Sequence, residues 1–369
     1  MAMPYDQSCG HLGIIRQAIE NAGIRQSMSS DAALQEPVRR HRATSSRVRG
    51  VLLLLAKFAL AFGVIFWMYQ GGILDFSALS TLEPDGRTLG LLFVAGLAIC
   101  GTLVAITYRL WILVRVQNFQ APVKDLFKLT WAAALCSVVA PGLLGADAFK
   151  AAYLCSRVSE RRMDVFAAII FDRIVGLFSL FLLGSIAVAV AWSANAIPFQ
   201  SAILWAAPVA LCAVSIGGFL VGWDGTYGLP PIQWLVQRAP AALQSLVQAF
   251  RKFAKAPRAI VITVGLSLIS HTLIVFVFVV VAHLIHDPLS MFDVAVLNPI
   301  AVTMNAVPVT PGGLGVTEGT FAYLAKQAGS DNGALIALIS RMIQYAVYIP
   351  GGLLSIFFLR WQGYRIPTA

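Results

Sequence analysis

Long apolar segments, separated by short polar and basic loops, dominate the sequence after residue 50. Six of these segments are long enough and poor enough in charge to cross a bilayer as α-helices, because a helix rises about 1.5 Å per residue through a hydrocarbon core about 30 Å thick. The six predicted spans are Val51–Tyr69, Thr88–Val114, Val165–Trp192, Ala202–Val221, Ile260–Leu284 and Gly333–Leu359. The pattern therefore predicts an all-α polytopic membrane protein.

Two further apolar segments, Leu126–Leu154 and Phe292–Leu324, contain clusters of Pro and Gly near their centres. Both residue types disfavour a continuous helix, so each segment is predicted to form a broken-helix hairpin. Irregular backbone survives at membrane depth only where protein or a water-filled cavity covers it. The stretch NAVPVTPGGLGVTEGTFAYL, residues 305–324, also carries the carboxylate of Glu318. We therefore expect it to line a polar cavity.

Lys and Arg are sorted between the two sides of the predicted membrane. Nineteen lie in loops and terminal segments on one side, whereas the connections on the other side hold Arg87 and Lys326. Because cytoplasmic loops carry the basic excess, both termini are predicted in the cytoplasm and the chain in the inner (cytoplasmic) membrane. Basic residues flank the 126–154 hairpin on both sides and are sparse around the 292–324 hairpin. We expect the first to be re-entrant from the cytoplasm and the second from outside.

The two broken segments are copies of one another. After a shift of 170 residues, PGLLGADAFKAAYL (141–154) aligns with PGGLGVTEGTFAYL (311–324), with seven of fourteen positions identical. Arg173 and Arg341, 168 positions apart, each lie in the span after their hairpin. Each copy then holds three spans, and an odd number inverts the second copy. Inverted repeats with broken helices near the midplane are typical of secondary transporters.

These patterns divide the chain into four parts and one added helix. The parts are a partly disordered cytoplasmic extension (1–50), a first membrane repeat (51–192) with hairpin 126–154, a second, inverted repeat (202–360) with hairpin 292–324, and a cytoplasmic tail (361–369). Between the fourth and fifth spans, QWLVQRAPAALQSLVQAFRKFAK predicts an amphipathic helix that lies at the membrane interface.

Composition and motifs exclude several classes of function. Hydrophobic residues form 58% of the 369 positions and charged residues 12%, unlike an ordinary soluble domain. The net charge is +10, but the basic stripe interleaved with aromatic residues that nucleic-acid-binding proteins carry is missing, so we expect no nucleic acid partner. No P-loop, GxGxxG motif or metal-ligand cluster is present, and we expect no cofactor and no metal.

Charged residues inside the apolar segments are the candidates for a functional site: Asp147, Lys150, Asp172, Arg173, Glu318 and Arg341. An unpaired Arg at the bilayer centre costs about 2.5–3.5 kcal/mol or more. We therefore expect Arg173 to pair with Asp147, and Arg341 with Glu318. These pairs either lock each hairpin to its span or open to bind a lipid phosphate, which the fork of a guanidinium group fits.

Gly312, Gly313, Gly315 and Asn305 complete the predicted substrate-binding set. Glycine adopts positive φ and lets a lipid head group approach the backbone closely. A helix that begins after Gly315 would present free N–H groups, which suit a phosphate. Packing of the two hairpin tips against each other requires the same glycines. Asn305 is predicted to add a polar group to the cavity wall.

The motifs APGLLGADAFKAAYL, FDRIVGLFSL and NAVPVTPGGLGVTEGTFAYL resemble the flippase-like transmembrane domain of lysylphosphatidylglycerol synthetases. The resemblance covers roughly Val51 to Arg360, and the domain also occurs in free-standing membrane proteins. It implies movement of aminoacylated, hopanoid or polyprenyl-linked lipids between leaflets. A soluble aminoacyl-transferase domain follows the membrane part of the full synthetases. This sequence contains none, so we do not expect lysine transfer.

Three functions fit these patterns. We expect a lipid flippase, not an enzyme, whose partners are membrane lipids: an anionic phospholipid or a lipid-linked precursor. A membrane transferase acting on lipid would need Asp147 or Glu318 as its catalytic carboxylate, and no donor-binding motif accompanies them. The third function is a non-transporting member of a lipid-modifying complex. A homodimer and complexes with lipid-biosynthesis enzymes are the protein assemblies considered.

Overall fold

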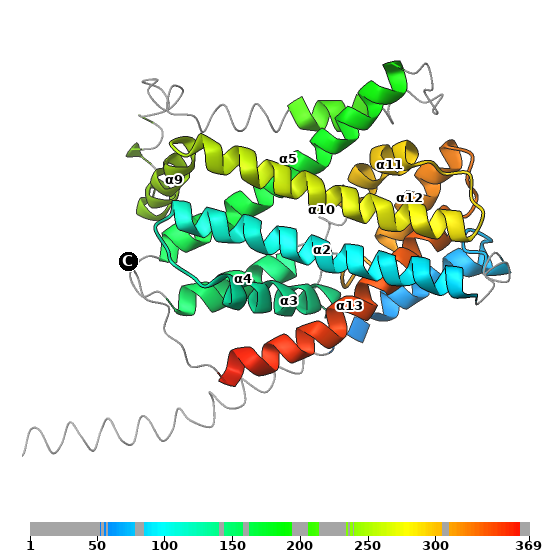
Figure 1. The fold of residues 1–369 in the computed structure, drawn as a ribbon, viewed down its shortest axis with the longest axis horizontal. Coiled ribbons are helices and arrows are strands. Elements are labelled where there is room, and N and C mark those ends of the chain that lie inside the picture. The colour runs from blue at the N-terminus through cyan, green and yellow to red at the C-terminus, as the bar shows by residue number, and fades with distance from the viewer. Residues whose placement is uncertain are drawn as a thin grey trace, which may run out of the picture. The chain divides into compact units, whose positions relative to one another are not determined.

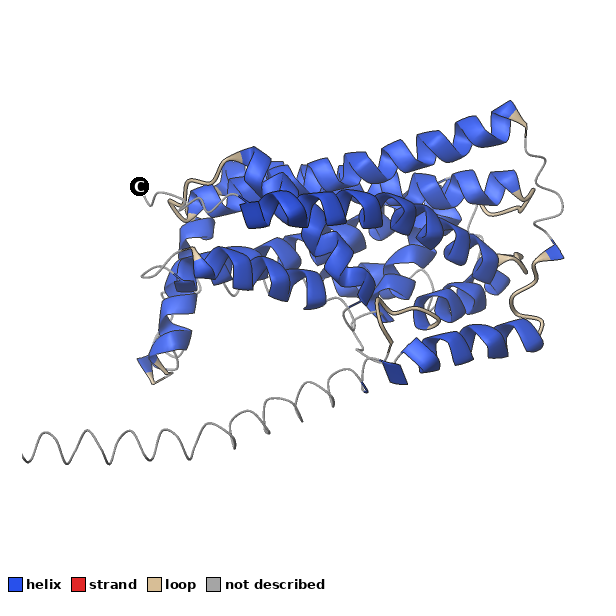
Figure 2. Cartoon of the chain, turned by 90° about the horizontal axis from the view of Figure 1, so that it is seen from below, coloured by secondary structure: helices blue, strands red, loops and turns tan. Residues whose placement is uncertain are grey.

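A computed structural model describes residues 58–77, 85–139, 144–157, 162–193, 206–213, 240–304 and 310–361, together with a few isolated positions. Within these ranges the regular structure is helical throughout, joined by short loops (Figure 2). The chain divides into two units, Met1–Lys57 and Phe58–Ala369. The helices described below all belong to the second unit.

Four long apolar helices match predicted spans: α2 (Gly86–Val116), α5 (Arg162–Ser193), α10 (Pro257–Leu284) and α13 (Gly333–Trp361). Each is long and apolar enough to cross a membrane, and its ends lie within three residues of the predicted ones. Asp85 caps α2 by accepting a hydrogen bond from the Thr88 amide at 2.7 Å, and this bond lowers the pKa of the Asp85 carboxyl. These four predictions of helices are confirmed.

The other two predicted spans are described in part. Phe58–Gln70 is a shorter apolar helix inside the predicted span Val51–Tyr69. Residues 206–213 are helical within Ala202–Val221. Apart from a few isolated positions, the rest of these two spans lies outside the described residues. The predicted N-terminal extension (1–50) and residues 362–369 of the predicted tail lie outside them as well.

Both Pro/Gly-rich segments are broken helices. The first consists of α3 (Val123–Val139) and α4 (Leu144–Ser156), and the second of α11 (Met291–Met304) and α12 (Val316–Gln327). In each segment the two helices pack against each other. Residues 140–143 and 305–309, at the two breaks, lie outside the described residues. The predicted helix–break–helix pattern is confirmed for both segments.

Helices α2 and α10 lie side by side and antiparallel (Figure 1). At one end, a guanidinium nitrogen of Arg87 lies 3.3 Å from Nε2 of His283. Further along α2, Arg109 Nη1 donates to Ser267 Oγ at 2.9 Å. Residue numbers rise along α2 while they fall along α10, so the two helices run in opposite directions.

The helices of the two halves have corresponding packing partners. Helix α3 packs on α13 as α11 packs on α5, and α2 packs on α13 as α10 packs on α5. Likewise, α2 contacts α3 as α10 contacts α11, and α4 contacts α5 as α12 contacts α13. Helix α2 therefore occupies the place in the first half that α10 occupies in the second.

Helix α9 (Ala241–Ala254) is the amphipathic helix predicted between the fourth and fifth spans. Its apolar face packs on α5, where the ring of Phe253 stacks on Phe171 with centroids 4.1 Å apart. Gln117 Nε2 donates to the Ala249 carbonyl at 2.7 Å. This face contacts protein, and the position of α9 at the membrane interface stays a prediction.

Helices α3 and α13 approach closely at a glycine. A Cβ atom added at Gly352 would lie 2.4 Å from Cβ of Leu135, a distance that the two helices would have to widen. Nearby, Trp131 Nε1 donates to the Val347 carbonyl at 3.1 Å. The same helix pair forms one wall of the cavity described below.

Gly352→Ala should destabilise the protein by about 1–3 kcal/mol, because the added methyl group overpacks the contact between α3 and α13. Gly265→Ala on α10 is the matched control, since a Cβ there meets no atom within 4 Å. The control should be neutral or gain up to about 1 kcal/mol in helix propensity. Thermal unfolding of the detergent-purified variants measures both changes. Equal midpoints for the two variants would contradict the close contact.

Candidate functional site

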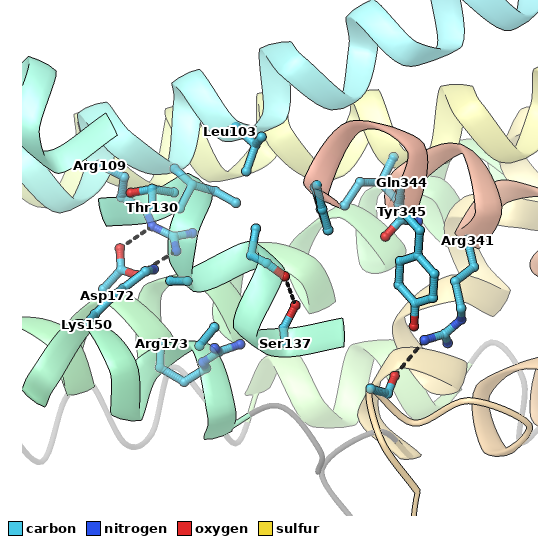
Figure 3. A pocket seen from close by; sticks show the side chains of 17 residues that line it. Leu103, Arg109, Thr130, Ser137, Lys150, Asp172, Arg173, Arg341, Gln344 and Tyr345 are labelled. Atoms are coloured by element: carbon cyan, nitrogen blue, oxygen red, sulfur yellow. Dashed lines mark hydrogen bonds and ion pairs between the residues drawn. The ribbon is translucent and has the colours of Figure 1, made fainter. Parts of the chain in front are cut away.

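A cavity of about 270 Å³ lies between the two halves of the fold. Its wall comes from α2, α3, α4, α5, α10 and α13, together with Gly312 in the turn before α12. Five charged side chains line it: Arg109, Lys150, Asp172, Arg173 and Arg341 (Figure 3). Four of these, Lys150, Asp172, Arg173 and Arg341, lie in or after the broken segments. Most of the charged side chains inside the apolar segments therefore line this cavity.

The first predicted ion pair forms between α5 and the first turn of α4. Arg173 Nε donates to Asp147 Oδ2 at 2.6 Å, and its Nη2 also contacts that oxygen. The Arg173 side chain is 35% exposed and that of Asp147 is 14% exposed. The pair ties the second helix of the first hairpin to the following span, as predicted, and leaves the guanidinium accessible.

The second predicted pair is more deeply buried. Arg341 Nε donates to Glu318 Oε1, and Arg341 Nη1 donates to the Gly312 carbonyl at 2.6 Å. The side chains are 12% and 2% exposed, respectively. Glu318 also accepts a hydrogen bond from the Gly315 amide through its other oxygen at 2.7 Å. This pair therefore fixes α13, the turn and the beginning of α12 together.

The turn before α12 uses positive φ at the predicted glycines, with +56° at Gly312, +68° at Gly313 and +87° at Gly315. A Cβ at Gly312 would lie 3.1 Å from the Ser137 carbonyl oxygen, so the second hairpin meets the end of α3 there. This contact supports the packing interpretation of Gly312, which also lines the cavity.

Gly315 is not among the residues that line the cavity. A Cβ there would lie 2.9 Å from Cγ1 of Val64, on the Phe58–Gln70 helix. Its amide is bonded to Glu318, and the Thr317 amide donates to the Gly313 carbonyl at 3.1 Å. The carboxylate of Glu318 thus occupies the place where a phosphate was expected at the beginning of α12.

Asn305, the remaining member of the predicted binding set, lies outside the described residues.

Sequence reasoning missed Arg109. Its Nε and Nη2 donate to the two carboxylate oxygens of Asp172 at 2.6 and 3.0 Å, and both residues are buried. Lys150 Nζ lies 3.9 Å from the same carboxylate. In the sequence, Arg109 lies near the end of its predicted span and shortly before Arg115. It therefore resembles one of the basic residues that flank a loop. The available signal was Asp172, since a carboxylate inside an apolar span requires a cation.

Residues 54–352 match the family model described as Lysylphosphatidylglycerol synthase TM region. The matched residues make up more than half of the chain. The chain belongs to the lysylphosphatidylglycerol synthase transmembrane-region family. The resemblance stated from the sequence motifs is therefore confirmed. No curated protein and no solved structure matches the chain.

Membership in the lysylphosphatidylglycerol synthase transmembrane-region family, together with the four long apolar helices, makes the protein a multi-pass membrane protein with a lipid-related role. Both ion pairs and the cavity lie within the matched residues.

The cavity of this family member carries a surplus of positive charge. Among the described residues that line it or pair with its lining, the cations are Arg109, Lys150, Arg173 and Arg341, and the carboxylates are Asp147, Asp172 and Glu318. Four cations against three carboxylates give a formal charge of +1. Because attraction between charges is strong away from bulk water, the site favours an anion.

Asp172→Ala should destabilise this protein by about 3–5 kcal/mol, because Arg109 would remain buried without its partner. Asp164→Ala on the same helix is the control: Asp164 pairs with Lys252 at 3.0 Å, with side chains 22% and 39% exposed. Removal of this partly exposed pair should cost at most about 1 kcal/mol. Chemical unfolding of the purified variants measures the difference, and equal losses would refute the role of the buried pair.

Proposed function

We propose that the protein moves an anionic or modified membrane lipid between the two leaflets of the membrane. The observation that carries this proposal is the cavity with a formal surplus of one positive charge, lined by Arg173 and Arg341 from the two repeats. The cargo is a membrane lipid: an anionic phospholipid, or an aminoacylated, hopanoid or polyprenyl-linked lipid. The protein acts as a translocator and not as an enzyme.

The internal symmetry supports an alternating-access mechanism. Helices α2 and α10 occupy corresponding places in the two halves and run antiparallel, and their packing partners correspond as well. We infer six spanning helices and two re-entrant hairpins arranged as an inverted repeat. In such transporters the substrate site lies at the repeat interface, and each half adopts in turn the conformation of the other.

The ion pairs suggest how a head group is exchanged. In the absence of lipid, Asp147 and Glu318 hold the two arginines and keep the hairpins closed on their spans. A lipid phosphate competes with these carboxylates for the guanidinium groups, while the acyl chains stay in the hydrocarbon. Arg173 is 35% exposed and Arg341 is 12% exposed. Of the two arginines, Arg173 is therefore the more accessible to the phosphate.

The distribution of basic residues supports an orientation with both termini in the cytoplasm, in the inner membrane. A complex with lipid-biosynthesis enzymes would place the cavity beside the source of its cargo, and a homodimer is the other assembly that we propose.

Topology can be tested by cysteine labelling in a background without native cysteines. Cysteines introduced near Lys124 and Arg157 should both react with a membrane-impermeant maleimide from the cytoplasmic side. Cysteines near Leu289 and Lys326 should both react from the outer side, because each pair flanks one re-entrant hairpin. Labelling from opposite sides within either pair would show that the hairpin spans the membrane and that the repeat is not inverted.

Transport can be tested with purified protein in liposomes that contain fluorescent anionic, aminoacylated or polyprenyl lipids. Dithionite, which quenches the fluorophore in the outer leaflet, reports exchange between leaflets. We expect the wild-type protein to accelerate exchange of at least one of these lipids. Rates equal to those of protein-free liposomes for the whole panel would refute the proposed function.

Substitutions at Arg341 separate transport from folding. Arg341→Lys keeps the charge and loses the fork, so exchange should fall while thermal stability stays close to wild type. Arg341→Ala should also lose about 3–5 kcal/mol of stability, because Glu318 remains buried without its cation. Glu318→Gln/Arg341→Ala should regain stability without transport, since the glutamine oxygen still accepts from the Gly315 amide. If exchange follows stability across the series, the arginine is structural.

A further inference from the structure

Lys150 is the cation in the cavity whose donors are least used. It lies on α4, lines the cavity and is 5% exposed. Its Nζ atom lies 3.9 Å from Asp172 Oδ2, which is an ion pair but is too long for a hydrogen bond. Within the described part of the chain, no hydrogen bond to this ammonium group is formed. A buried ammonium group with unused donors is costly unless an anion or water fills them.

The guanidinium groups nearby are already bonded to protein. Arg109 donates through Nε and Nη2 to Asp172 and through Nη1 to Ser267 Oγ. Arg341 donates to Glu318 and to the Gly312 carbonyl. Because Asp172 accepts two short hydrogen bonds from Arg109, it is weakly available to Lys150. The lysine therefore has donors for a ligand without breaking a hydrogen bond within the protein.

This charge cluster belongs to the first repeat alone. In the alignment of the two repeats, Thr320 corresponds to Lys150 and Ser340 corresponds to Asp172. Figure 3 shows Lys150, Asp172 and Arg109 at one end of the pocket, with Arg341, Tyr345 and Gln344 at the other. The pocket thus has one end with unused cationic donors, on the side of α4.

We propose that the ammonium group of Lys150 is the anion seat of the cavity and binds a singly charged phosphate group. The formal charge of +1 is neutralised by one monoanion, whereas a diphosphate would leave negative charge in excess. The buried Arg109–Asp172 pair is a positioning pair that holds α5 beside the lysine. The inference rests on the proposed function where it takes the phosphate to be part of a lipid. Free phosphate offers the same chemistry to the lysine.

The size of the cavity fits this assignment. Its volume of about 270 Å³ is slightly below the range of about 300–1,000 Å³ typical of small-molecule pockets. It therefore accommodates a phosphate head group and leaves the acyl chains outside.

The test measures binding of two probes to the full-length protein in detergent: dihexanoyl phosphatidylglycerol, a water-soluble phosphodiester lipid, and inorganic phosphate. For the wild type we expect saturable binding of the lipid probe by isothermal titration. In Lys150→Met the dissociation constant should rise about ten- to one-hundredfold, the effect of losing a charge-assisted hydrogen bond. Lys252→Met is the control: it removes one positive charge that pairs with Asp164 outside the cavity, and it should bind as the wild type does.

Lys150→Gln is a second variant that keeps an N–H donor on a side chain one bond shorter and removes the charge, and it should show the same loss of affinity. The proposal is wrong if the wild type binds neither probe, if both Lys150 variants bind as the wild type does, or if neither variant folds. Binding of inorganic phosphate as well as lipid would support a seat that recognises phosphate itself. Binding of the lipid alone would support a seat for the phosphodiester of a lipid head group.

Leaflet exchange in liposomes distinguishes this inference from the proposed function. If the wild type binds the probe through Lys150 but exchanges no lipid, the seat stands and translocation fails. If the wild type exchanges lipid and the Lys150 variants match it in binding and rate, translocation stands and the seat fails. With both correct, Lys150→Met should raise the mole fraction of fluorescent phosphatidylglycerol at half-maximal rate. Its thermal midpoint should stay near that of the control, which a purely structural role does not predict.

Discussion

The carboxylate of Glu318 is bonded on two sides, to the Gly315 amide at the beginning of α12 and to Arg341 on α13. A break in a helix exposes backbone groups that hydrocarbon cannot satisfy, and a buried carboxylate needs a cation. This one side chain meets both requirements. The turn with positive φ at Gly312, the closure against α3 and the wall of the cavity all depend on its position.

The two hairpins differ in how they place the carboxylate that pairs with the arginine of the following span. In the repeat alignment Asp147 corresponds to Thr317, so the acidic residue of the second copy lies one position later, at Glu318. The two pairs also differ in exposure, with Arg173 more open than Arg341. Two related segments thus provide one accessible guanidinium and one that is held inside the turn.

Much of the fold follows from one-dimensional patterns. Hydropathy located α2, α5, α10 and α13 because a membrane helix must be apolar over its whole length, and the Pro/Gly clusters located both breaks. The repeat and the free-energy cost of an unpaired buried Arg predicted both ion pairs. The role of Arg109 was not predicted because its partner Asp172 is 63 positions away, on another helix. The use of the Gly315 amide by Glu318, and the burial of α9 on α5, depend on tertiary packing that no local pattern encodes.

The antiparallel contact of α2 with α10 has a consequence for how charge can be arranged. In a dimer of two identical single repeats this contact would be isologous, and every side chain would occur twice. The net charge around a central cavity would then be even. In a chain that carries both repeats, the two copies can differ in sequence. One half holds Lys150 and Asp172 where the other holds Thr320 and Ser340. A homodimer of single repeats therefore cannot have the odd formal charge of +1 that surrounds the cavity of this chain.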